Sequence, residues 1–253
     1  MATKTFKGGA HPPERKHRTE TLAIEYLRTV KQVVVPVNQH FGAPIQPLVK
    51  VGDQVKRGQK IADAEGRMTV PVHAPIAGVV KKIEPRLQAN NAEGPAIVIE
   101  ADGSDAEDFL QPLDGFSCTR EEALERIREA GIIGMGGAGF PTHVKLAPPP
   151  NKPIDIVIGN AAECEPYLTV DELMMEEMPG DIVEGMAIVM RILGVKKGVL
   201  GIEDNKAHLV PKLQDLAKER GHGADIQVPI LQTKYPQGGE KMLIPAITGR
   251  EVP

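Results

Sequence analysis

The sequence predicts an all-β domain followed by an α/β domain whose sheet is mainly parallel. Between residues 33 and 100, short β-branched or apolar runs alternate with turn residues, which is the pattern of an all-β fold. After residue 119, apolar runs alternate with segments of helical length, which favours parallel strands joined by helical crossovers. A chain of 253 residues with 41% hydrophobic residues is large enough for two domains. We expect them at residues 31–115 and 116–253.

Residues 1–30 are predicted to form an extended arm rather than a helix or a central strand. They are basic and contain the pairs Gly8-Gly9 and Pro12-Pro13, which interrupt regular elements. Residues 1–18 hold no hydrophobic stretch, and the sequence contains no run of eighteen apolar residues, so we expect neither a secretory signal nor a membrane span. These observations predict a cytosolic protein.

The all-β domain is expected to consist of short strands at residues 33–35, 48–51, 54–55, 60–62, 70–72, 78–83 and 96–100. Segments 51–62 and 73–80 resemble the paired hammerhead turns of biotinyl and lipoyl carrier domains, which implies a barrel-sandwich hybrid fold. Carriers bear an acylated lysine seven residues before the alanine of an Ala-Pro pair, and counting back from Ala74 gives Arg67. Because a guanidinium is not a nucleophile at cellular pH, we reject a carrier function and expect Arg67 to be a solvated turn residue.

The α/β domain is expected to begin with a helix. Thr119 and Glu122 have the spacing of a capping box, and Gly131 is expected to end this helix. Further on, we expect strands at residues 154–158, 198–202 and 226–231, and helices at residues 171–177, 182–193 and 206–220. Pro211 is a weak point of the last helix.

A glycine-rich segment at residues 134–145 is the strongest functional signal. Four glycines stand within six positions, and a lysine follows them: Gly134, Gly136, Gly137, Gly139 and Lys145. Without a Cβ the backbone can approach a ligand closely and adopt φ > 0, so that N–H groups cradle a phosphate. Lys145 adds a positive charge. By itself, such a loop also fits a purely structural turn.

A second polar segment follows the predicted strand 154–158. Ligands of open α/β sheets collect at the carboxyl ends of strands, where Asn160, Glu163 and Glu165 stand. Asn160 can donate and accept hydrogen bonds, as the edge of a flavin ring requires, and the two glutamates can orient a carboxamide. Alternatively, Asn160 and Glu163 cap the following helix. Together with the glycine segment, they favour a shared pocket for a nucleotide cofactor.

Composition excludes several other functions. The two cysteines, Cys118 and Cys164, are too few and too far apart to assemble a zinc or iron–sulfur site. The seven histidines lack a metal-ligand spacing such as HExxH. A net charge of -4, with three Tyr, five Phe and no Trp, offers neither a basic face nor stacking platforms, so we expect no binding to nucleic acid.

Residues 134–142 with Lys145, and residues 160–166, resemble the FMN- and NADH-binding subunit of respiratory complex I. Residues 8–14, the hammerhead segments and residues 235–241 are more similar to the RnfC family, which belongs to the Rnf ion-translocating ferredoxin:NAD oxidoreductases. The likeness covers nearly the whole chain. It implies that an α/β domain similar to the complex I flavoprotein follows the barrel in the sequence.

The resemblance implies site residues. The four glycines would surround the flavin phosphate and ribityl chain, Lys145 would neutralise the phosphate, and Asn160 and Glu163 would meet the flavin ring. Phe140 would face the incoming nicotinamide nucleotide. A further segment of the family falls on Tyr235, Gly238 and Glu240, near the nucleotide cleft.

The chain departs from the complex I pattern at three positions. Met135 replaces an arginine, Ala162 an aspartate and Gly239 a glutamate. These changes remove polar groups from the expected cleft, so the resemblance supports FMN binding more strongly than NAD(H) binding.

The implied activity is electron transfer between NAD(H) and iron–sulfur clusters or ferredoxin, coupled to ion translocation. The chain would act with other subunits of a membrane complex, peripherally on the cytoplasmic side of the inner membrane. Family members continue into a ubiquitin-like domain and a ferredoxin-like domain, whose eight cysteines ligate 4Fe–4S clusters. We therefore expect this chain to be a soluble piece of a longer protein that lacks the one-electron exit.

Two alternatives remain open at this point. The first is a structural subunit without flavin, like the related subunit of the sodium-pumping quinone reductase, because Met135 and Ala162 are consistent with a lost site. The second is a cobalamin reductase of propanediol-degrading microcompartments, which has similar barrel and flavin domains.

Overall fold

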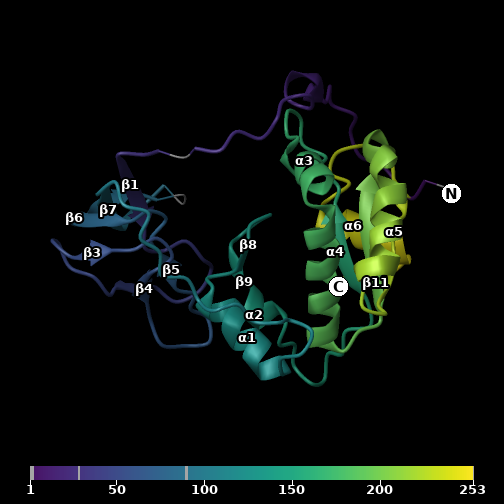
Figure 1. Ribbon diagram of the computed structural model, residues 1–253. Coiled ribbons are helices and arrows are strands. Elements are labelled where there is room, and N and C mark those ends of the chain that lie inside the picture. The colour runs from purple at the N-terminus through teal and green to yellow at the C-terminus, as the bar shows by residue number, and fades with distance from the viewer. Residues whose placement is uncertain (1–2, 28, 89–90, 253) are drawn as a thin grey trace. The chain divides into compact units, whose positions relative to one another are not determined.

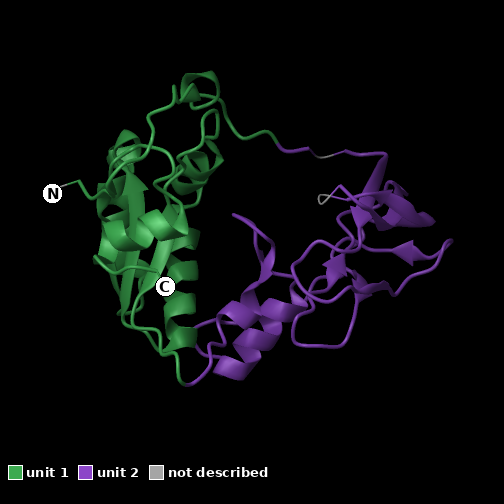
Figure 2. Cartoon of the chain, turned by 180° about the vertical axis from the view of Figure 1, so that it is seen from behind, with its two compact units in different colours: residues 1–25, 151–253 green, residues 26–150 purple. Residues whose placement is uncertain are grey.

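The computed structural model describes residues 3–27, 29–88 and 91–252. Contacts divide the chain into two compact units, which are coloured separately in Figure 2. One unit is Tyr26–Pro150, and the other combines Met1–Glu25 with Asn151–Pro253. Residues 116–150 thus group with the barrel, although the sequence assigns them to the α/β domain. The domain boundaries at 31–115 and 116–253 stay a prediction, and each unit is described by itself.

In the unit Tyr26–Pro150, the barrel itself is formed by two antiparallel sheets (Figure 1). The larger sheet has the order β1 (Gln32–Pro36), β7 (Glu93–Ala101), β6 (Gly78–Leu87) and β3 (Gln54–Val55). The smaller sheet has the order β2 (Gln46–Pro47), β4 (Lys60–Asp63) and β5 (Val72–His73). Side chains from both sheets form one apolar core, in which Ile45, Ile61, Val80, Ile97 and Ile99 are fully buried. The predicted all-β fold is confirmed.

The expected strand at residues 48–51 is wrong. The backbone turns there, because Lys50 N donates to a carboxylate oxygen of Asp53 (2.8 Å) and Asp53 N donates back to Lys50 O (3.1 Å). Leu48 and Val51 are exposed, and the strand lies earlier, at Gln46–Pro47. The β-branched residues of this run therefore belong to a turn that a side chain closes.

The capping box at the start of α1 (Arg120–Glu129) is confirmed. Glu122 N donates to Thr119 Oγ1 (3.2 Å), and Thr119 N donates to a carboxylate oxygen of Glu122 (2.7 Å). Gly131 follows the helix with φ +73°, as a C-terminal glycine does. A short hairpin of β8 (Ile133–Gly134) and β9 (Phe140–Pro141) then leads into α2 (Thr142–Lys145). No pattern of residues indicated this hairpin.

The second unit is built on the predicted parallel sheet. Strand β11 (Lys197–Glu203) lies between β10 (Val157–Ala161) on one side and both β12 (Asp225–Gln227) and β13 (Ile230–Leu231) on the other. The helices of this unit are α3 (Val170–Glu177), α4 (Pro179–Leu193), α5 (Val210–Arg220) and α6 (Glu240–Thr248) (Figure 1).

Two glycines of β11 let helices approach both faces of the sheet. A Cβ at Gly198 would lie 2.6 Å from the sulfur of Met190 in α4. A Cβ at Gly201, which points to the opposite face, would lie 3.1 Å from Ile247 in α6. Larger residues at these positions would push the helices away.

Element boundaries shift from the predicted ones for local reasons. The expected strand 154–158 begins three residues later, at Val157. The expected helix 206–220 is divided into a 3-10 segment (Asp204–Leu209) and α5, which places Pro211 in the first helical turn, where no N–H is needed. The expected strand 226–231 is interrupted before Ile230 and forms two short strands.

Residues 3–25 run along the second unit. Lys4 N donates to Ile230 O (2.8 Å), and Ala10 exchanges two 2.8 Å backbone hydrogen bonds with Tyr235. A 3-10 turn, Lys16–Arg18, follows. This part of the predicted arm is therefore irregular but docked.

Candidate functional site

The glycine loop connects β8 to β9 and is exposed. A Cβ built on Gly136 or Gly137 would meet no atom within 4 Å, so the structure leaves open space at both positions. Of the four glycines, only Gly139 has a positive φ, +66°. Only Gly139 therefore needs the conformational freedom of glycine. The other three glycines leave space in the loop because they lack a side chain.

Lys145 ends α2, and its side chain reaches back to the start of the loop. Its Nζ lies 3.0 Å from the position that a Cβ on Gly134 would take. Among the residues that the structure describes, this ammonium has no hydrogen-bond or ion-pair partner. An exposed cation next to a bare backbone loop can accept an anion without breaking an internal pair.

Asn160 and Gly238, both predicted site residues, lie together at the carboxyl end of β10. Asn160 Nδ2 donates to Gly238 O (3.0 Å), and Ala162 N donates to Asn160 Oδ1 (3.2 Å). A Cβ on Gly238 would lie 2.7 Å from Ala162 O, so only glycine permits this approach. Asn160 does not cap the following helix, because its side-chain amide links residues 160–166 to residues 235–241.

Glu163 takes part in a buried ion cluster. Its side chain is 2% exposed, and its second carboxylate oxygen lies 3.6 Å from Lys16 Nζ and 3.9 Å from Lys206 Nζ. Glu203, also buried, lies 3.4 Å from Lys206. The other oxygen of Glu163 accepts from Asp171 N (2.9 Å) in the first turn of α3. The carboxylate thus performs the helix-capping role that the sequence left open.

Lys16 brings the arm into this cluster. Its ammonium donates to Glu163 O (2.8 Å), to Glu165 O (3.3 Å) and to Leu168 O. The residue is 5% exposed. Nothing in the sequence separates Lys16 from the other basic residues of the arm, so sequence reasoning missed it.

Burial also sets the protonation of the cluster. It raises the pKa of Glu203 above its usual range, and the charge of Lys206 acts in the opposite direction. Two lysines and two glutamates are thus packed together where little water reaches them. Removing one member of such a cluster would leave a buried charge without its partner.

The remaining predicted residues are exposed or half-buried. Glu165 offers only its carbonyl to Lys16, and Tyr235 is 44% exposed. Glu240 begins α6. Phe140, half-buried, stacks on Phe41 with ring centroids 5.9 Å apart. The glycine-loop residues belong to one compact unit, and the residues from Asn160 onward belong to the other.

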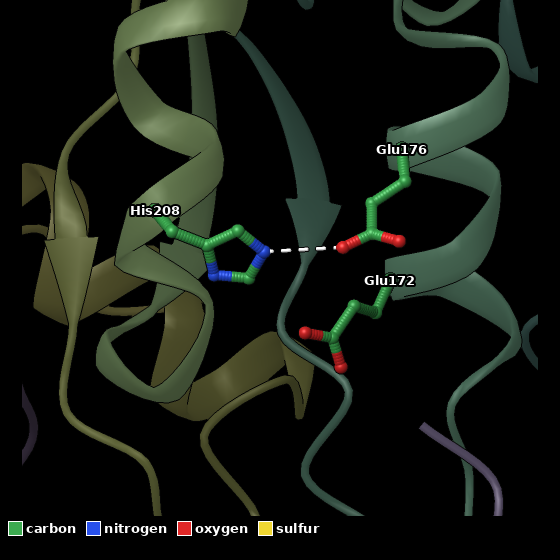
Figure 3. Close-up of side chains that lie close together, drawn as sticks. All are labelled: Glu172, Glu176 and His208. Atoms are coloured by element: carbon green, nitrogen blue, oxygen red, sulfur yellow. Dashed lines mark hydrogen bonds and ion pairs between the residues drawn. The ribbon is translucent and has the colours of Figure 1, made fainter. Parts of the chain in front are cut away.

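A carboxylate–histidine cluster lies between α3 and the 3-10 segment (Figure 3). It consists of Glu172, Glu176 and His208, whose donor atoms lie within 4.8 Å of one another. His208 Nε2 is already paired with a Glu176 oxygen at 3.2 Å, and both residues are exposed. Burial raises the pKa of Glu172. The sequence shows the two glutamates four positions apart, as on one face of a helix. It does not show that His208 lies beside them.

Two family models match the chain. Residues 4–104 match the RnfC barrel sandwich hybrid domain, and residues 127–253 match the Nuo51 FMN-binding domain. The fold thus places the chain among proteins that join such a barrel to a flavoprotein-type α/β domain.

Curated relatives narrow this class. The RnfC protein of the Na(+)-translocating ferredoxin:NAD(+) oxidoreductase complex of Acetobacterium woodii is 44% identical over 251 residues, which cover 98% of this chain and 56% of the relative. The RnfC protein of the proton-translocating ferredoxin:NAD(+) oxidoreductase complex of Clostridium ljungdahlii is 46% identical over 257 residues, with 99% and 54% coverage. The chain belongs to the RnfC family, and the predicted resemblance is confirmed. It spans about half the length of these relatives.

A solved structure supports the fold. The NAD+-reducing NiFe-hydrogenase in the H2-reduced state matches with a TM-score of 0.50 and 23% identity, covering 55% of this chain and 26% of that chain. Within the described part of this chain, no helix is both long and apolar enough to traverse a lipid bilayer.

Proposed function

We propose that this chain supplies the FMN and NAD(H) site of an oxidoreductase subunit in an Rnf-type electron-transport complex. The complete protein would pass electrons between NAD(H) and iron–sulfur clusters or ferredoxin, coupled to ion translocation. The observation that carries the proposal is Lys145, an ammonium without a partner among the described residues, beside an exposed glycine loop in a domain of the Nuo51 FMN-binding family.

The residues present fit the phosphate of FMN. The open space at Gly136 and Gly137 lets an anion approach backbone N–H groups, and Gly134 and Gly139 complete the loop. Lys145 would pair with the phosphate charge. Bound FMN accepts a hydride as an electron pair and releases single electrons, which is the chemistry that joins nicotinamide to iron–sulfur clusters.

The protein's own part is to bind and orient. Asn160 offers a polar amide at the end of β10, held by Gly238 and Ala162. For Glu163, the sequence implied a contact with the flavin ring. Its carboxylate is used inside the protein, so we propose that it acts by shaping the loop that follows Asn160. No side-chain nucleophile or general base is required.

NAD(H) binding is the finer part of the proposal. Phe140 would offer an apolar face to the nicotinamide nucleotide, and we propose Tyr235, Gly238, Glu240 and the exposed Glu165 as further contacts of this ligand. Met135 is 90% exposed and provides no charge where the complex I subunit has an arginine. We therefore expect weaker binding of NADH than of FMN.

The partners and the location are also proposals. With only Cys118 and Cys164, this chain cannot assemble a 4Fe–4S cluster, so the cluster ligands would come from outside it. We propose contacts with other subunits of the complex and with ferredoxin, on the cytoplasmic side of the membrane.

The comparisons give no support to a flavin-free subunit or to a cobalamin reductase.

The test is a calorimetric titration of the full-length protein with FMN. Lys145→Ala should weaken binding about 10-fold or more, because it removes a charge-assisted contact to the phosphate. Lys82→Ala is the matched control, since Lys82 is a 62%-exposed lysine of the same unit. Equal affinities for all three proteins, or no binding at all, would overturn the proposed site.

A further inference from the structure

Loop 38–44 of the barrel contacts the glycine loop. Phe41 N donates to Gly139 O at 2.9 Å. With φ +66°, a Cβ on Gly139 would lie 3.0 Å from Gln39 O and 3.4 Å from His40 Cα. Glycine at position 139 therefore relieves both backbone strain and crowding, and it allows the two loops to meet.

The barrel holds this loop in place. Ala43 N donates to Met68 O (3.0 Å), and Ile45 N donates to Asn38 Oδ1 (3.2 Å). Ile45 itself is fully buried in the barrel core. A Cβ on Gly42 would lie 2.0 Å from Met68 O, so the backbones are in close contact there. These contacts fasten the loop that carries residue 41 to the barrel.

Phe41 presents an aromatic ring beside the glycine loop. The ring stacks on Phe140 with centroids 5.9 Å apart and planes inclined by 19°. It nevertheless remains 56% exposed, in a chain with five Phe, three Tyr and no Trp. A stacked ring with this exposure has surface left for another planar group.

The aromatic pair lies next to a positive charge. Gly134 is the cross-strand partner of Phe140 in the hairpin, and a Cβ on Gly134 would lie 3.0 Å from Lys145 Nζ. The flat apolar surface of the two rings therefore lies close to the Lys145 ammonium, which has no partner among the described residues. A planar heteroaromatic ring linked to a phosphate, which is a nucleotide, has the complementary chemistry.

We propose that Phe41, a residue of the barrel domain, is a binding residue of the nicotinamide nucleotide site and stacks with Phe140 against a planar ring of NADH. This inference deepens the proposed function and rests on it. It assigns the barrel a direct part in substrate binding. The proposed function already gives Phe140 to the nicotinamide nucleotide and Asn160 to the flavin ring, so we assign the surface that Phe41 shares with Phe140 to NADH.

The test compares Phe41→Leu, Phe41→Tyr and the wild type in the full-length protein by calorimetric titration with NADH. Leucine keeps the apolar volume but loses the ring, so affinity should fall about 2- to 10-fold. Tyrosine keeps the ring and should restore the affinity. Phe109→Leu is the matched control, because Phe109 is a 54%-exposed ring of the same unit that lies over Arg57.

A parallel titration with FMN separates this inference from the proposed function. If Phe41→Leu weakens NADH binding and leaves FMN binding unchanged, the inference is supported. Unchanged NADH affinity, an equal loss in Phe109→Leu, or a loss confined to FMN would overturn it. If the wild type binds NADH but not FMN, the proposed flavin site fails while the result for Phe41 still stands. If the wild type binds FMN but not NADH, the inference for Phe41 fails while the proposed flavin site still stands.

Discussion

Replacing Lys16 by methionine tests whether the arm stabilises the α/β unit. In the folded protein the ammonium of Lys16 donates to three carbonyl groups of residues 163–168 and lies 3.6 Å from the Glu163 carboxylate. Methionine fills a similar volume without charge. The substitution therefore leaves a carboxylate that is 2% exposed with Lys206, at 3.9 Å, as its remaining cation.

The expected cost is large for a single substitution. Removing one partner of a buried ion pair costs about 3–5 kcal/mol, and the remaining lysine favours the lower end. For a protein of this size, 1 kcal/mol changes Tm by about 2–4 °C. We therefore expect Lys16→Met to lower Tm by roughly 10 °C.

Thermal unfolding followed by circular dichroism measures this change. Lys7→Met is the control, because Lys7 is an exposed lysine of the same arm, and it should change stability by no more than about 0.5 kcal/mol. The double variant Lys16→Met/Glu163→Gln should lose less than the sum of its single variants, since the two side chains interact. If Lys16→Met unfolds at the same temperature as Lys7→Met, the arm does not stabilise the unit as described.

Two further substitutions probe the loop and the acidic cluster. Gly139→Ala should destabilise the protein by about 1–2 kcal/mol, because residue 139 has a positive φ. Gly136→Ala should leave Tm unchanged, because there is open space at that position, but it should weaken FMN binding in a titration. Equal Tm values for the two variants would contradict this reasoning. Burial raises the pKa of Glu172 in the folded protein above its value in the unfolded chain. At a pH above the usual pKa of a glutamate, the ionised side chain therefore destabilises the folded state. Glu172→Gln should therefore raise Tm at pH 7 and have no effect at pH 4, and a pH-independent effect would refute this.

Local signals in the sequence predicted local structure well. The capping box of Thr119 and Glu122 depends on residues three apart, and both of its hydrogen bonds form. The parallel sheet followed from apolar runs separated by helices. At residues 48–51 the same kind of reasoning failed, because the side chain of Asp53 closes a turn that β-branched residues do not reveal.

Long-range contacts were beyond the sequence. The partners of Lys16 are about 150 positions away, and no pattern connects them. Arg67 was expected to be solvated; it is exposed, but its guanidinium also donates to Ala147 O (3.3 Å) and its carbonyl contacts His143 (2.9 Å). Such pairings arise from tertiary packing. The roles of the predicted site residues stay predictions, although Asn160 and Gly238 lie in contact.

The docking of residues 3–25 has a practical consequence for anyone who isolates the flavoprotein domain. A polypeptide cut at the family boundary, residue 127, would lose Lys4 from the edge of β13 and Lys16 from the ion cluster. A free strand edge invites aggregation, and a buried carboxylate that has lost one of its two lysine partners favours unfolding. Supplying residues 1–25 in trans, or fusing them ahead of residue 151 through a flexible linker, should rescue solubility.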